Sequence, residues 1–254
     1  MYRPRIIPVL LLKNKGLVKS IKFKNHRYIG DPINAVRILN ELKADELAFI
    51  DILATREKRT ISPDFVRNVG EEANMPFSAG GGIRTLEDIR RILGAGAEKV
   101  ILNTIAGEDP VFVRKAADTF GTSTISVCID VKKNVWGKEK AWIRAGEKSI
   151  QPDPVRFAKQ MEENGAGEIV IQSIDRDGTM KGYDIDLVKR IAGSVGIPVV
   201  CLGGAGEFED MVTINSEVQL NGLAAGSLFI YHGKRRAVLV NYPEKKQILK
   251  LSDK

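Results

Sequence analysis

Short, continuous apolar segments alternate along the chain with longer segments whose apolar residues recur every three or four positions. Such apolar runs are typical of parallel strands covered on both faces, which lack the in-and-out alternation of half-exposed strands. The pattern predicts eight strands, at residues 6–12, 47–52, 76–79, 100–102, 123–129, 169–171, 198–202 and 223–225.

Between these segments the spacing predicts amphipathic helices at residues 32–42, 86–93, 111–120, 154–164 and 185–192. Several follow a side chain that commonly caps a helix N-terminus, namely Asp31, Thr85 and Asp153. Strands alternating with helices indicate an α/β fold. Eight such units in 254 residues predict a single TIM barrel spanning residues 1–254.

The two halves of the chain repeat each other at a nearly constant offset. Asp31-Pro32 recurs as Asp153-Pro154, and Gly80-Gly81 recurs as Gly203-Gly204. This predicts a barrel built from two half-barrels, about 1–120 and about 121–230, followed by a diverged tail at 231–254. The basic run 234–236 and the strand-like segment 237–241 stand where a long last helix belongs, so we expect that helix to be truncated or replaced.

Composition narrows the classes of partner. The net charge is +7, but basic residues are interspersed with acids, which favours a phosphorylated small molecule or an acidic partner over nucleic acid. Cys128 and Cys201 lie in apolar runs and indicate buried thiols in a reducing compartment. We expect a cytoplasmic protein without a membrane span, and neither His26 nor His232 has partners that suggest a metal or cofactor site.

Two glycine-rich strand ends, at residues 79–83 and 202–206, are the clearest ligand signals. Their backbone N–H groups can approach an anion, although tight packing is the competing interpretation. Two such sites in symmetric halves predict a ligand with a phosphate at each end. The candidate phosphate-binding residues are Gly82, Asn103, Thr104, Gly204, Gly226 and Ser227.

Four aspartates lie at or just beyond predicted strand ends, on the face where such barrels carry their chemistry: Asp51, Asp130, Asp175 and Asp177. Asp130 is expected to end an apolar strand, where partial burial would raise the pKa and suit a general acid–base role. For Asp51 and Asp175, loop capping or a hydrogen bond to a ligand hydroxyl competes equally with catalysis. Asp51 and Asp177 are counted among the ligand-binding candidates.

At the opposite barrel end, Arg5, Glu46, Lys99 and Glu168 stand at strand starts, where their side chains are expected to meet. The two interpretations are a structural ion-pair plug and a gate across the barrel bottom. A long basic segment, 132–148, carries Trp136 and Trp142. It is expected either to cover a ligand or partner, or to be a solvated hairpin.

Together these residues resemble the cyclase subunit of the imidazole glycerol phosphate synthase family, from Arg5 to about Phe229. The resemblance implies that a glutaminase subunit, a class I amidotransferase, docks on the barrel bottom. Its ammonia would pass a gate formed by the four charged residues and reach a bis-phosphate substrate. The matching segments are 5–8, 30–32, 44–47, 80–84, 103–104, 165–168, 175–179, 182–184 and 203–206.

The resemblance also identifies a departure. The family uses two aspartates as acid and base; Asp130 matches one, and Leu11 occupies the position of the other. Because an aliphatic side chain cannot transfer a proton, efficient cyclase activity of the barrel alone is not expected. Gln172 and Leu202 stand where the family usually has small hydroxyl residues. With the altered tail, this pattern resembles a paralogous group linked to O-antigen biosynthesis and acetamidino modification of bacterial surface sugars.

We therefore expect a barrel subunit of a glutamine-dependent amidotransferase system that passes ammonia to a separate sugar amidotransferase. One alternative is the ordinary cyclase subunit, a lyase of histidine biosynthesis working with Asp130 alone. A second is a non-catalytic scaffold that activates the glutaminase.

Overall fold

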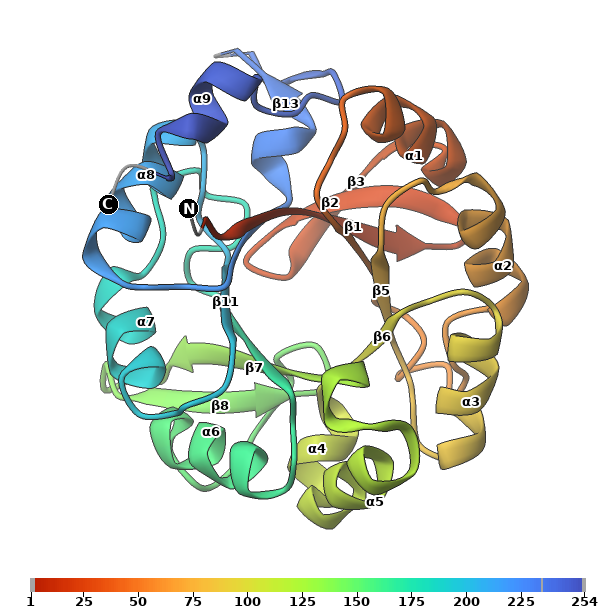
Figure 1. Ribbon diagram of the computed structural model, residues 1–254. Helices are drawn as coiled ribbons and strands as arrows, with labels where there is room; N and C mark the ends of the chain where they lie inside the picture. Colours follow the sequence, from red (N-terminus) through yellow and green to blue (C-terminus); the bar gives the residue numbers. More distant parts are fainter. Residues whose placement is uncertain (1–2, 234, 253–254) are drawn as a thin grey trace.

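A computed structural model describes residues 3–233 and 235–252. Eight parallel strands close into a barrel whose outer face is covered by helices (Figure 1). The last strand pairs with the first, with Arg5 opposite Gly222 and Pro8 opposite Ala225. The barrel strands are, in order, β1 (Arg5–Lys13), β4 (Leu47–Asp51), β5 (Phe77–Gly80), β6 (Lys99–Leu102), β7 (Ile125–Lys133), β10 (Glu168–Ser173), β11 (Val199–Leu202) and β12 (Gly222–Ala225). All eight predicted strands and the single TIM barrel are confirmed, whereas the half-barrel duplication stays a prediction.

The helices pack around the outside of this sheet. Each of the three expected caps is present: Asp31 accepts a hydrogen bond from the Asn34 backbone N–H at 2.9 Å, Thr85 forms a capping box, and Asp153 caps the sixth helix. The helices are α1 (Pro32–Glu41), α2 (Pro63–Glu72), α3 (Leu86–Gly94), α4 (Thr104–Glu108), α5 (Pro110–Phe120), α6 (Pro154–Glu163), α7 (Ile185–Ala192), α8 (Phe208–Glu217) and α9 (Lys245–Leu249). The five predicted helices are confirmed, and α2 and α8 are the main ones that the pattern missed.

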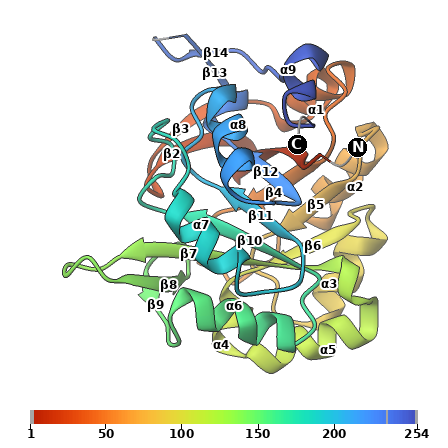
Figure 2. The same cartoon turned by 60° about the vertical axis from the view of Figure 1, so that its left-hand side comes forward.

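Two barrel strands continue into antiparallel hairpins. β1 pairs with β2 (Gly16–Ile21), which pairs with β3 (Lys24–Gly30); β7 pairs with β8 (Glu139–Ile143), which pairs with β9 (Lys148–Ser149). The β7–β8 hairpin projects from the body of the barrel (Figure 2). The expectation that Asp130 ends its strand is therefore wrong, because β7 runs on to Lys133 along β8.

The segment 132–148 belongs mostly to this hairpin. Trp136 at its tip is 86% exposed. Trp142 is half-buried, and its Nε1 donates a hydrogen bond to the Lys132 carbonyl at 3.1 Å. Trp136 is therefore largely free for contact at the hairpin tip, whereas Trp142 is partly used in holding the hairpin together.

Apolar side chains fill the interior of the barrel as well as the layer under the helices. Because side chains alternate along a strand, one face of each barrel strand points into the lumen. The lumen cluster consists of Ile7, Val9, Ala48, Ile101, Val170, Val200 and Ala224, with Leu11, Ile50, Cys128 and Leu202 packed against it. The middle of the lumen is thus lined without charge.

The chain after β12 departs from the βα pattern, as expected. A short 3₁₀ turn, η2 (Ser227–Phe229), leads into β13 (Tyr231–His232) and β14 (Ala237–Val238), so the strand is shorter than the predicted 237–241. Lys234, part of the basic run, lies outside the described residues. Tyr242 anchors this tail, because its hydroxyl donates to the Ile6 carbonyl at 3.1 Å and accepts from the Asp45 N–H at 3.0 Å.

We expect Tyr242→Phe to lower the free energy of unfolding by about 1–3 kcal/mol, because the buried Ile6 carbonyl and Asp45 N–H both lose the hydroxyl. Urea denaturation would measure the difference. Tyr28→Phe is the matched control, since that ring is 67% exposed. Equal stability of Tyr242→Phe and the natural protein would contradict the anchoring role.

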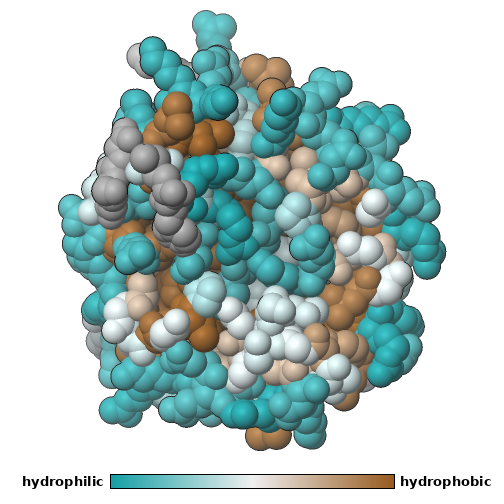
Figure 3. All heavy atoms as spheres, in the orientation of Figure 1, coloured by the Kyte–Doolittle hydropathy of each residue, from teal (hydrophilic) through white to brown (hydrophobic). Residues whose placement is uncertain are grey.

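The surface is mixed in polarity. The face seen in Figure 3 carries hydrophilic residues around its centre and apolar patches towards the rim. Across residues 3–233 and 235–252, none of the helices is long and apolar enough to cross a membrane.

Candidate functional site

Four charged side chains meet where the barrel strands begin. Arg5 reaches Glu46 with one terminal nitrogen and Glu168 with the other. Lys99 Nζ lies 3.5 Å from a Glu46 oxygen and 3.6 Å from a Glu168 oxygen. We call these four residues the charged ring. The structure brings together all four residues that the sequence placed at the barrel bottom.

The charged ring is balanced, and its two carboxylates are buried. Glu46 is 4% exposed and Glu168 is 7% exposed, so each carboxylate depends on its cationic partners. Burial alone would lower the pKa of Arg5, but the charges of Glu168 and Glu46 raise it above its ordinary value. Ser126 adds a hydrogen bond to Glu168 at 3.3 Å. These contacts tie the starts of β1, β4, β6, β7 and β10 together at the lower end of the barrel.

Asp130 occupies the upper part of the lumen, on β7. It is 6% exposed, and burial raises the pKa of its carboxyl to about 7, with the nearby Asp177 charge acting in the same direction. The Cys128 thiol donates a hydrogen bond to it at 3.5 Å, which opposes the rise. A carboxyl in this condition can both donate and accept a proton near neutral pH.

This raised pKa predicts a pH-dependent stability. The folded state binds a proton at Asp130 more tightly than an unfolded chain with a pKa of about 3.9, so stability falls as pH rises from about 4 to about 7. We expect Asp130→Asn to be the more stable protein at about pH 8. That advantage should vanish at about pH 3 and below, under both pKa values, where the carboxyl is protonated in both states. Urea denaturation at both pH values measures this, and a pH-independent difference would contradict it.

Leu11 lies on β1, at the position where the resemblance places the second catalytic carboxylate. It pairs with Ile50 in the barrel sheet. Like Leu202, it packs against the lumen cluster. The upper lumen is therefore apolar on the β1 side.

Two other aspartates of this barrel end are held by neighbouring loops. Asp51 accepts hydrogen bonds from the N–H groups of Leu53 and Ala54, and pairs with Arg59 at 2.5 Å. Asp175 accepts a hydrogen bond from the Lys133 N–H at 2.9 Å. Their contacts are those of loop-capping residues.

Asp177 joins the first hairpin to the barrel mouth. Its carboxylate accepts hydrogen bonds from Ser20 Oγ at 2.9 Å and from the Phe23 N–H at 3.2 Å. Burial raises its pKa, while these donors and the charge of Lys19 oppose the rise. Asp177 thus combines a structural role with a position beside Asp130.

Lys19 is a candidate functional residue that the sequence reasoning missed. It lies on β2, is 5% exposed, and donates from Nζ to the Val9 carbonyl at 2.6 Å. Burial lowers its pKa to about 8, although the Asp177 charge opposes this. A side chain on Gly226 would come within 2.6 Å of the Lys19 ammonium, which places this charge over the loop after β12. No local pattern marks it, since a lone lysine in a hairpin is ordinarily solvated.

The glycine loops are tightly packed against the protein itself. Gly82 has φ +68°, and a Cβ there would lie 1.8 Å from the Arg59 carbonyl oxygen. Gly204 has φ +114°, and a Cβ would lie 2.1 Å from the Gly182 carbonyl oxygen. Glycine is thus required at both positions by packing alone.

The polar residues beside these loops are also engaged. Asn103 Nδ2 donates to the Cys128 carbonyl at 3.0 Å, and Thr104 Oγ1 accepts from the Arg144 N–H at 3.2 Å. Ser227 is buried at the start of η2.

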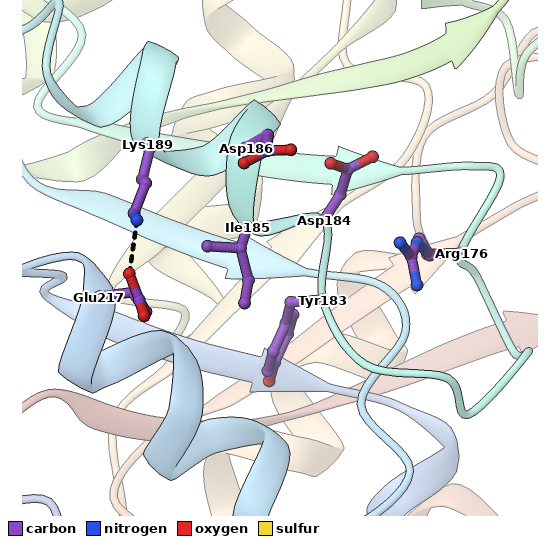
Figure 4. A pocket seen from close by; sticks show the side chains of 7 residues that line it. All are labelled: Arg176, Tyr183, Asp184, Ile185, Asp186, Lys189 and Glu217. Atoms are coloured by element: carbon purple, nitrogen blue, oxygen red, sulfur yellow. Dashed lines mark hydrogen bonds and ion pairs between the residues drawn. The ribbon is translucent and has the colours of Figure 1, made fainter.

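A surface pocket of about 370 Å³ lies outside the barrel, between α7 and α8 (Figure 4). Lys189 and Glu217 form an ion pair of 2.5 Å across it, and Tyr183 donates from its hydroxyl to the Ala224 carbonyl. None of the predicted site residues lines this pocket. In the described part of the chain, no group of three or more His, Cys, Asp or Glu side chains has the geometry for a metal ion.

The fold and these residues define the class of protein. It is a TIM barrel with a charged ring at one end of the lumen and a buried acid at the other. A family profile described as "Histidine biosynthesis protein" matches residues 5–236. "Putative imidazole glycerol phosphate synthase subunit hisF2" of Pseudomonas aeruginosa is 45% identical over 96% of this chain and 97% of its own. "Putative imidazole glycerol phosphate synthase subunit hisF3" of Vibrio vulnificus is 46% identical over 99% of this chain and 98% of its own.

"Imidazole glycerol phosphate synthase subunit HisF" of Alkaliphilus metalliredigens is 39% identical over 91% of this chain and 92% of its own. The chain therefore belongs to the HisF family of histidine biosynthesis proteins.

Proposed function

We propose that this protein is the barrel subunit of a glutamine-dependent amidotransferase system. It receives ammonia from a glutaminase at the barrel bottom and passes it through the lumen. A separate sugar amidotransferase then uses the ammonia to amidinate a sugar of a bacterial surface polysaccharide. The observation that carries the proposal is the combination of an intact charged ring with Leu11 in place of the second catalytic carboxylate.

The charged ring supports the gating step. Arg5, Glu46, Lys99 and Glu168 close one end of the lumen through ion pairs that can separate and re-form. Movement of one cation breaks contacts with both carboxylates, so the ring can respond to a partner bound beneath it. The names of the relatives describe subunits, which supports a glutaminase as that partner.

The lumen cluster supports the conducting step. Its residues are all uncharged, and all are aliphatic except Cys128, which has a thiol. Losing its hydration shell in such surroundings costs an ammonium ion far more free energy than it costs neutral ammonia. The lumen therefore favours the nucleophilic form of the nitrogen.

Leu11 argues against a primary role in histidine biosynthesis. Ring closure by general acid–base catalysis needs a pair of proton-transferring groups, and β1 supplies an aliphatic side chain at this point. Four relatives at 44–46% identity carry the qualifier "Putative" in their names, whereas four at 38–40% carry the name HisF without it. The chain is thus closer to the qualified group.

A phosphorylated ligand would bind beside the glycine loops rather than on the loop glycines themselves. The loop glycines are needed for packing, so the ligand would rely on Thr104, Ser227 and the backbone N–H groups beside them, with Asn103 and Gly226 completing the two sites. The nearby Lys19 ammonium supports an anion at the loop after β12.

The partner step is tested with the class I glutaminase subunits of the same organism. We expect one of them to bind the barrel and to hydrolyse glutamine faster in its presence. The acceptor step is tested by deleting the gene for the barrel. Acetamidino groups should disappear from the surface polysaccharide while growth without histidine is unaffected. Histidine auxotrophy with unchanged polysaccharide would instead favour the cyclase.

A purely non-catalytic scaffold makes a different prediction. Glutaminase stimulation would survive, but ¹⁵N from the glutamine amide would not reach the acceptor. Isotope transfer in the reconstituted system therefore separates a scaffold from a conduit.

A further inference from the structure

Gln172 is a buried amide whose carbonyl oxygen has no hydrogen-bond partner among the described residues. It is 4% exposed, and its Nε2 donates to Asp177 Oδ1 at 3.5 Å. Its Oε1 is buried and has no donor within hydrogen-bonding distance in the described residues. An unmatched buried amide oxygen costs free energy, so its retention calls for an explanation.

The orientation of the amide follows from its neighbour. Turning the group over would place the carbonyl oxygen against the Asp177 carboxylate, an acceptor facing an acceptor. Burial raises the pKa of that carboxyl, but it already accepts hydrogen bonds from Ser20 Oγ and the Phe23 N–H, which hold it as an acceptor. The free atom is therefore the acceptor oxygen, and what it requires is a donor.

The position of Gln172 relates it to the lumen. On β10 it lies two residues beyond Val170, which belongs to the lumen cluster, and so points to the same face of the strand. Its partners in register are Asp130 on β7 and Leu202 on β11. Gln172 thus stands beside the buried acid, at the upper end of the apolar lumen.

The route through the lumen favours a small, uncharged donor. Leu202 and Leu11 take up space near this level and offer no hydrogen bond, and the lumen below is aliphatic. Ammonia has three N–H donors, and the Asp130 carboxyl offers a second acceptor nearby. We propose that Gln172 Oε1 holds one ammonia molecule at the upper end of the lumen, beside Asp130. This inference rests on the proposed conduit function and adds the residue at which ammonia is held.

The test follows the side-chain amide of Gln172 by ¹H–¹⁵N NMR on the full chain. Its two N–H signals are assigned by their loss in Gln172→Met. Ammonium chloride is titrated at about pH 9.5, where much of the nitrogen is neutral ammonia, with sodium chloride at matched ionic strength and methylamine as a larger amine. We expect a saturable shift with ammonia and little change with either comparison.

Gln160 provides a matched control within the same spectrum. Its Oε1 is also buried without a partner, but it lies on α6, outside the barrel. No shift at Gln172, an equal shift at Gln160, or an equal response to methylamine would overturn the proposal. Because the titration uses the barrel alone, failure to bind a glutaminase leaves this result unaffected, and a negative titration leaves glutaminase binding unaffected.

Discussion

Replacing Arg5 with methionine is expected to lower the free energy of unfolding by about 3–5 kcal/mol, the range found when one partner of a buried ion pair is removed. Arg5 contacts both Glu46 and Glu168, and each carboxylate is almost fully buried. Lys99, at 3.5 Å and 3.6 Å, cannot neutralise both. Urea denaturation at neutral pH measures the loss.

Two further variants make this prediction specific. Arg67→Met removes an exposed pair with Asp64, and it should change stability by less than about 1 kcal/mol. Adding Glu46→Gln and Glu168→Gln to Arg5→Met removes the uncompensated charges and should restore much of the stability. If the single variant is as stable as the natural protein, the charged ring is not a buried network. If the triple variant is stable but no longer responds to glutaminase, the charges serve the partner rather than the fold.

At saturating ammonium, we expect the cyclase turnover of this protein to be at least about 100-fold below that of a relative named HisF without the qualifier. A positioned acid or base contributes about 10²–10⁴-fold to the rate. Ammonium bypasses the glutaminase and isolates the chemistry of the barrel. The substrate is the bis-phosphate intermediate of histidine biosynthesis. Leu11→Asp should raise turnover, and adding Asp130→Asn should abolish the gain.

Leu11→Asn separates proton transfer from polarity, because its side chain has nearly the shape of aspartate but no acid–base function. It should stay as inactive as the natural protein. Substantial turnover by the natural protein, lost in Asp130→Asn, would show that one carboxylate suffices and would restore the histidine enzyme as the function.

The barrel was predictable because its strands are continuous apolar runs, such as Ile6 to Leu12, that need no tertiary information to recognise. The first hairpin was not, because β3 is polar and mostly exposed, and its pairing with β2 leaves no periodic signal. Helix α8 was missed for a related reason: Asn215 is buried in it through a hydrogen bond to the Leu251 carbonyl, so a polar residue stands on its inner face.

The candidate site was likewise predictable only in part. The charged ring was predictable because strand starts in a parallel barrel share one end, so residues such as Arg5 and Glu168 must converge. The raised pKa of Asp130 depends on burial and on the charge of Asp177, which follows β10, and Asp177 in turn interacts with Lys19 on β2. The strand extension past Asp130 likewise depends on pairing with β8, which the local pattern around residue 130 does not encode.

The loop glycines have an evolutionary consequence. A methyl group at Gly82 or Gly204 would collide with a carbonyl oxygen of the barrel's own loops. Selection for a folded barrel is therefore enough to preserve these residues, whether or not a phosphate is bound beside them. A lineage can change its substrate completely and still keep the glycines of its ancestor. A change of ligand is therefore expected to appear in neighbouring residues such as Leu11, Gln172 and Leu202.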